Sequence, residues 1–131
     1  MELSIFIVED DPLLLQVAEH MIVGLGHRVC GSAASVDEAI KGIETLSPQL
    51  VLVDIQLDGK LTGINLGAYI NRHFEIPFIY QSSVEDIEMM AVAIATNPYG
   101  YLRKPFNSLE LFMAIGIALN KRPRKPHLIP D

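Results

Sequence analysis

Acidic side chains follow two apolar runs whose composition is typical of buried strands. Glu9, Asp10 and Asp11 come after Leu3–Val8, and Asp54 comes after Leu50–Val53. Carboxylates that meet at one place repel one another when ionised, and an all-oxygen ligand set of this kind favours Mg²⁺ or Mn²⁺. A carboxylate can also act as a nucleophile. These residue types therefore indicate a cation site in which Asp54 could accept a phosphoryl group.

Hydroxyl and ammonium groups follow two later apolar runs. Ser82 and Ser83 come after Phe78–Tyr80, and Lys104 comes after Tyr99–Arg103. A lysine supplies a positive charge and a serine supplies a hydrogen-bond donor, and both can hold a phosphoryl group beside a metal ion. We therefore include Ser82 and Lys104 with the acidic residues in one candidate site.

Each of these features also has an ordinary structural explanation. Acids at the start of a helix offset the helix dipole, a carboxylate after a strand can cap a turn, and paired serines are typical N-caps. Lys104-Pro105 is a weak signal by itself. The combination is more specific, because each group follows a strand and parallel strands end at the same edge of a sheet.

The elements that would position these groups can be predicted from apolar spacing. Short apolar runs alternate with stretches in which apolar residues recur every three or four positions, as on one face of a helix. The predicted strands are Leu3–Val8, Arg28–Ala33, Leu50–Val53, Phe78–Tyr80 and Tyr99–Arg103. The predicted helices cover Pro12–Leu25, a segment from the Ser35 cap to Leu46, Ile64–Phe74, about 84–96 and about 108–120.

Five strand–helix units at this spacing predict an α/β fold, a single doubly wound domain with a parallel sheet covered by helices on both faces. We place this domain at residues 1–120. Residues 121–131 contain three prolines and four of the ten basic residues. That composition is typical of a linker, which would lead to a module outside this chain.

Charge and composition exclude several function classes. The net charge is −6, and half of the residues are hydrophobic. An acidic body binds nucleic acid or anionic membranes poorly. No apolar run is long enough to cross a membrane, and the start of the chain lacks the pattern of a secretion signal. One cysteine, Cys30, fits a reducing compartment, so we expect a cytoplasmic protein without direct nucleic-acid or membrane binding.

The segments IFIVEDDP, LVLVDIQL, IPFIYQSS and GYLRKPF, in this order and spacing, resemble the response-regulator receiver domain of two-component signalling. The resemblance covers about residues 3–120. It implies a flavodoxin-like (βα)5 fold with strand order 2-1-3-4-5. It also implies a phosphorylation-dependent signalling switch, in two-component systems or phosphorelays, that catalyses only its own phosphotransfer and slow autodephosphorylation.

The resemblance assigns a role to individual positions. Glu9 and Asp10 match the acidic metal pair, Asp54 the phosphorylated aspartate, and Lys104 the lysine that precedes a cis-proline. Ser82 and Tyr101 match the two switch residues, and the backbone carbonyl of Gln56 would complete the Mg²⁺ shell. The phosphoryl donor would be a sensor histidine kinase or a phosphotransfer protein. The face of the fourth helix, fifth strand and fifth helix would control an output module, a partner or a homodimer.

Some positions depart from the common receiver pattern, and three other classes of protein share parts of it. Gln81 replaces the usual apolar residue before the serine, and the loop after Asp54 is one residue longer than in many members. A flavodoxin-type cofactor binder would share the fold, but its phosphate loop would not be acidic. A haloacid-dehalogenase-type phosphatase usually has a second aspartate two residues after the first, where this chain has Gln56. An interaction module that never takes phosphate would keep the fold without the chemistry.

Overall fold

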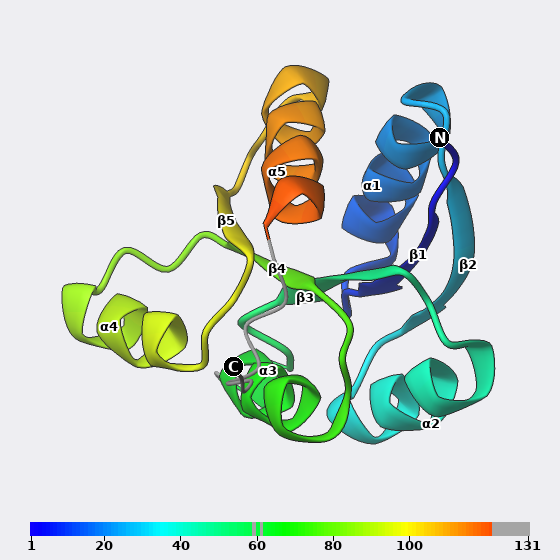
Figure 1. The fold of residues 1–131 in the computed structure, drawn as a ribbon. Helices are drawn as coiled ribbons and strands as arrows, with labels where there is room; N and C mark the ends of the chain where they lie inside the picture. The colour runs from blue at the N-terminus through cyan, green and yellow to red at the C-terminus, as the bar shows by residue number, and fades with distance from the viewer. Residues whose placement is uncertain (59, 61, 122–131) are drawn as a thin grey trace, which may run out of the picture.

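The computed structural model describes residues 1–58, 60 and 62–121 and contains five strands that alternate with five helices (Figure 1). The strands are β1 (Ser4–Val8), β2 (Arg28–Ala33), β3 (Leu50–Asp54), β4 (Phe78–Ser82) and β5 (Gly100–Arg103). The helices are α1 (Pro12–Gly24), α2 (Val36–Leu46), α3 (Thr62–His73), α4 (Ile87–Ala95) and α5 (Ser108–Asn120). Every predicted strand–helix unit is therefore present.

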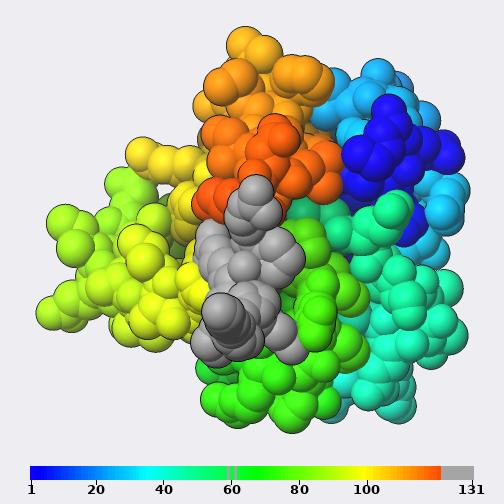
Figure 2. Space-filling view, viewed as in Figure 1, coloured from blue at the N-terminus to red at the C-terminus, as the bar shows by residue number. Residues whose placement is uncertain are grey.

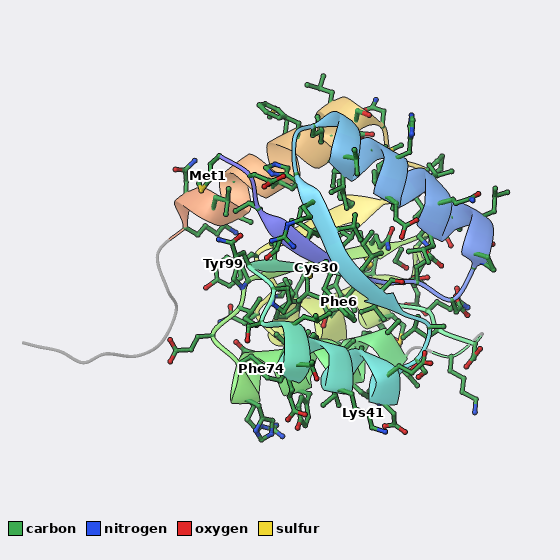
Figure 3. The ribbon with its side chains drawn as sticks, turned by 90° about the vertical axis from the view of Figure 1, so that its right-hand side faces the viewer. Met1, Phe6, Cys30, Lys41, Phe74 and Tyr99 are labelled. Carbon is green, nitrogen blue, oxygen red and sulfur yellow. The ribbon has the colours of Figure 1, made fainter. Side chains whose placement is uncertain are left out.

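The strands form one sheet in the order β2-β1-β3-β4-β5, and all neighbouring pairs are parallel. Helices α1 and α5 cover one face of the sheet, and α2 and α3 cover the other (Figures 1 and 3). This arrangement confirms the predicted doubly wound fold and its strand order. It also places the ends of β1, β3 and β5 along one edge.

Two apolar cores lie on the two faces of the sheet. Every residue of β1, β3 and β4 is buried, which explains why these strands read as continuous apolar runs in the sequence. Phe6 lies between the sheet and α2 (Figure 3). A Cβ atom at Gly42 would fall 2.6 Å from the Phe6 ring, so glycine lets α2 approach the sheet closely.

The starts of α4 and α3 are among the element boundaries that differ from the predicted ones. Helix α4 begins at Ile87 rather than near residue 84, because Ser82 continues β4 and pairs with Arg103 of β5. The helix is capped instead by Asp86, whose side chain accepts a hydrogen bond from the backbone N–H of Glu88. Helix α3 begins at Thr62, before the predicted start at Ile64.

The start of α3 packs directly on the end of β3. The backbone N–H of Gly63 donates to the carbonyl of Ile55 at 2.9 Å. A Cβ atom at position 63 would fall 1.9 Å from the carbonyl oxygen of Asp54, so only glycine fits this approach. The helix therefore begins as soon as the chain has returned across the carboxyl edge of the sheet.

Helix α4 is the least buried helix of the described chain and stands out from the body of the molecule (Figure 2). Of its nine residues, only Ala93 is fully buried. Around it, the Tyr80 hydroxyl lies 2.5 Å from the Thr96 hydroxyl, and the Tyr101 hydroxyl donates to Met90 Sδ at 3.2 Å. Side chains of the neighbouring strands thus hold α4 at a few points.

Within the described residues, no helix combines the length and the apolar character that crossing a membrane requires. The predicted linker falls almost entirely on residues 122–131, which lie outside the described part of the chain.

Candidate functional site

The first acidic residues are placed by the turn between β1 and α1. The backbone N–H of Glu9 donates to the carbonyl of Ala33, so the chain continues alongside β2 past the last residue of β1. The side chain of Asp11 then accepts hydrogen bonds from the N–H groups of Leu13 and Leu14 and caps α1. Of the three successive acids, Asp11 therefore has a capping role, while Glu9 and Asp10 face the carboxyl edge of the sheet.

Lys104 connects the ends of three strands. Its Nζ atom donates to Glu9 Oε1 at 2.7 Å and to Asp54 Oδ2 at 3.0 Å. Glu9 and Asp54 are 3% and 4% exposed, so both carboxylates depend on this ammonium for charge compensation. The peptide bond between Lys104 and Pro105 is cis, as the resemblance implied.

Asp10 completes a cluster of three carboxylates. One ligand oxygen from each of Glu9, Asp10 and Asp54 lies within 4.8 Å of the others. The backbone N–H of Asp58 donates to Asp10 Oδ2 at 2.6 Å, which ties the loop after β3 to the cluster. This hard, all-oxygen donor set fits Mg²⁺ or Mn²⁺, which prefer carboxylates and water.

Burial and the charge of Lys104 act in opposite directions on the pKa of Asp54. The pKa of Asp54 is raised to about 7, because desolvation and the negative charge of Glu9 raise it by more than Lys104 lowers it. Burial by itself would lower the pKa of Lys104, but the hydrogen bond to Glu9 and the charge of Asp54 raise it above the usual value. The pocket thus has one ammonium for two buried carboxyl groups, and a bound cation would relieve the excess negative charge.

The remaining predicted site residues are not part of the carboxylate cluster. Ser82 is fully buried, and its Oγ atom accepts a hydrogen bond from the N–H of Val84 at 2.9 Å. Tyr101 is half-buried and contacts α4 through Met90. The backbone N–H of Gln56 donates to Asp54 Oδ1 at 3.0 Å and fixes the carboxyl orientation. The predicted role of the Gln56 carbonyl as a metal ligand stays a prediction.

A pocket of about 520 Å³ opens over the cluster and extends between α1 and the β5–α5 turn. Its lining also includes Met21, Gln81 and Phe106, which were not among the predicted site residues. Met21 and Phe106 read as ordinary core positions in the sequence. Gln81 had a signal, since it is a polar residue inside an otherwise apolar strand.

A doubly wound α/β domain with a carboxylate–lysine pocket at the carboxyl edge of its sheet belongs to the class of receiver-like signalling domains. A family model described as the response regulator receiver domain matches residues 5–116. The chain belongs to the response regulator receiver domain family.

Relatives of known name agree with this assignment. The phyllosphere-induced regulator PhyR of Methylorubrum extorquens is 32% identical over 97% of this chain, which covers 49% of that protein. The nitrogen assimilation regulatory protein NtrX of Azorhizobium caulinodans is 31% identical over 88% of the chain, which covers 26% of that protein. The chain therefore spans half or less of the length of these relatives.

Solved structures show the same fold. The signal receiver domain of a modulated diguanylate cyclase from Desulfovibrio desulfuricans superposes with a TM-score of 0.84 at 32% identity, over 91% of this chain and 94% of that one. The receiver domain of Erythrobacter litoralis PhyR superposes with a TM-score of 0.81 at 28% identity, over 97% and 96% of the two chains. The family and the fold are thus supported independently.

Proposed function

We propose that this receiver domain takes a phosphoryl group on Asp54 from a phosphohistidine of a sensor histidine kinase or phosphotransfer protein. The observation that carries the proposal is the position of Lys104 Nζ, which bridges Asp54 and Glu9 within a pocket open to solvent. A carboxylate oxygen of Asp54 would form the new O–P bond as the N–P bond of the phosphohistidine breaks. The donor imidazole would keep the electron pair of that bond and take up a proton.

The residues of this chain supply orientation and charge for that transfer. The N–H of Gln56 holds one carboxyl oxygen of Asp54, and Lys104 holds the other. The fixed ammonium beside the acceptor would stabilise negative charge that develops on the transferred group. Glu9, Asp10 and Asp54, with the Gln56 carbonyl, would hold Mg²⁺ or Mn²⁺. When bound, such an ion supplies further charge stabilisation and a template for phosphoryl oxygens.

We propose that Ser82 and Tyr101 then change the surface around α4. The Ser82 hydroxyl would exchange its contact with the N–H of Val84 for a phosphoryl oxygen. Tyr101 would lose its contact with Met90 and turn inward. The phosphoryl group can shift this equilibrium only by contacting the two states differently, and the hydroxyl of Ser82 provides such a difference. The surface of α4, β5 and α5 would control an output module or a second copy of the domain.

We also propose that the domain works in the cytoplasm, since its one cysteine, Cys30, fits a reducing compartment. Its own chemistry would be restricted to phosphotransfer and slow autodephosphorylation, so it would act as a switch and not as an enzyme with a separate substrate.

Acetyl phosphate with Mg²⁺ tests the proposal. We expect the parent to gain the mass of one phosphoryl group and Asp54→Ala to gain none. Asp11→Asn is the matched control, because it removes a neighbouring acid while asparagine keeps the helix cap. Equal phosphorylation of the parent and Asp54→Ala would contradict the assignment of Asp54. No phosphorylation of the parent would contradict the proposed function.

A further inference from the structure

Gln81 is the one buried side chain of the described residues that has a polar atom without any hydrogen-bond partner there. The residue is 2% exposed, and its Nε2 atom has no partner among the described residues. A buried donor without a partner is unfavourable and rare in folded proteins, so each case calls for an explanation.

The position of Gln81 in the sheet directs its side chain toward the acidic pocket. Gln81 lies directly opposite Asp54 in the register of β4 and β3, and the N–H of Ile55 donates to its carbonyl. Side chains two residues apart share a face of a strand, and Ile79 belongs to the core under α1 and α5. Gln81 therefore lies on this same face and contributes to the lining of the pocket.

Two side-chain donors of the pocket, those of Lys104 and Gln81, differ in whether they have partners. The ammonium of Lys104 already donates to Glu9 and Asp54, so it is committed to the two buried carboxylates. Among the described residues of the pocket lining, the Nε2 group of Gln81 is the buried side-chain donor without a partner. It would gain a partner when an anionic oxygen enters the space beside Asp54.

We propose that Gln81 is a further contact residue of this pocket, whose Nε2–H donates to an oxygen of the phosphoryl group held on Asp54. The contact would be absent from the empty pocket and present in the loaded one, so it would stabilise the loaded state alone. This inference rests on the proposed function, because it requires a phosphoryl group at Asp54. Gln81 would then affect both the affinity of the pocket for the phosphoryl group and the lifetime of that group on Asp54.

Beryllofluoride with Mg²⁺ is the probe, since it occupies a phosphoryl site without reacting further. Gln81→Leu and Gln81→Met replace the amide by apolar groups of similar volume, so at least one variant is expected to fold. We expect both to bind beryllofluoride roughly tenfold more weakly than the parent, as for the loss of one hydrogen bond to a charged group. The phosphoryl group from acetyl phosphate should be lost correspondingly faster.

Two further measurements separate this role from a structural one. The Mg²⁺ affinity of the variants should stay within about twofold of the parent value, because they remove no metal ligand. Their urea midpoint should be at or above that of the parent, because they remove an unpaired buried donor. Gln16→Leu on the exposed side of α1 makes the same chemical change outside the pocket, and it should match the parent throughout.

The outcomes are distinguishable from a failure of the proposed function. If the parent binds beryllofluoride and both Gln81 variants bind it equally well, the inference is overturned and the proposed function stands. An equal loss of Mg²⁺ and beryllofluoride affinity would also overturn it, since Gln81 would then act through the metal. If the parent binds no beryllofluoride at all, both proposals fail together.

Discussion

At the scale of single residues, the carboxyl group of Asp54 and the ammonium group of Lys104 both have raised pKa values. The pKa of Asp54 is raised mainly by burial, although Lys104 lies 3.0 Å from one of its oxygens. A group that titrates this far from its ordinary range makes folding depend on pH.

Without metal, the free energy of unfolding should fall as the pH rises from about 4 to about 7. In this window, the folded chain keeps a proton on Asp54, whose pKa is about 7, and the unfolded chain has lost it, since the usual pKa is 3.8. Asp54→Asn lacks this titrating proton, so its free energy of unfolding should not decline over this pH range. At pH 8 its free energy of unfolding should therefore exceed that of the parent by at most about 4 kcal/mol. Urea unfolding in EDTA at several pH values measures the difference. Parallel pH profiles for the two proteins would contradict the raised pKa.

The carboxylate cluster predicts stabilisation by divalent cations. Mg²⁺ held by the ionised carboxylates of the folded chain would stabilise that chain, so the melting temperature of the parent should rise with Mg²⁺ concentration. Asp10→Asn removes one clustered ligand and should weaken Mg²⁺ affinity roughly tenfold or more. Asp11→Asn removes the same charge one residue away, where the side chain caps α1, and should keep the affinity of the parent. Equal effects of the two substitutions would indicate general charge screening and no defined site.

At the scale of elements, the sequence predicts most of the fold because local and tertiary signals agree. Strands β1, β3 and β4 are buried on both faces, so most of their residues are apolar and the strands can be found in the sequence. The start of α4 could not be predicted in the same way. Ser82 and Ser83 look like helix caps, but the pairing of Ser82 with β5 extends the strand and moves the cap to Asp86. That pairing is a tertiary contact without a local signature.

Close packing of α3 on β4 makes Gly67 sensitive to substitution. A Cβ atom at Gly67 would fall 1.9 Å from the hydroxyl of Tyr80, whose side chain is fully buried. Gly67→Ala should therefore lower the free energy of unfolding by about 1–3 kcal/mol. Gly116→Ala in α5 is the matched control, since a Cβ atom there would meet no described atom within 4 Å outside its own stretch of helix. It should raise stability by roughly 0.5–1 kcal/mol through helix propensity alone. Urea denaturation measures the change in the free energy of unfolding for each variant. Changes of the same sign in both variants would contradict the packing argument.

At the scale of the whole molecule, large apolar side chains remain exposed on α4 and α5. Ile94 on α4 is 67% exposed and Phe112 on α5 is 58% exposed. Such exposed apolar groups are candidate contacts for a partner. A homodimer through the face of α4, β5 and α5, one of the alternatives that the resemblance implies, would cover them.

Light scattering with and without beryllofluoride and Mg²⁺ tests that assembly. We expect the loaded parent to shift toward the mass of a dimer, and Ile94→Ser to weaken the shift roughly tenfold, because an exposed apolar contact would be lost. Leu13→Ser on α1 is the control, as Leu13 has the same exposed fraction of 67% but belongs to another face. A dimer that Leu13→Ser weakens and Ile94→Ser leaves intact would place the interface elsewhere.

The convergence of the acidic residues with Lys104 was predictable because the topology brings strand ends together. Glu9, Asp10 and Lys104 follow the ends of β1 and β5, and Asp54 is the last residue of β3. A parallel sheet places such positions at one edge. The unpaired donor of Gln81 was not predictable, since it depends on the packing of α1 and α5 over the same face. Side-chain partners of that kind are decided by three-dimensional packing and not by spacing along the chain.

The sparse attachment of α4 has a consequence for fluctuations of the native state. Releasing a helix that buries only Ala93 fully would expose little apolar surface, so a partly opened form should lie close in free energy to the closed one. Amide protons in α4 should then exchange with solvent much sooner than those of β1 and β3. A binding protein that captures the released helix would select a conformation that the domain already visits, while the sheet and its acidic edge keep their structure.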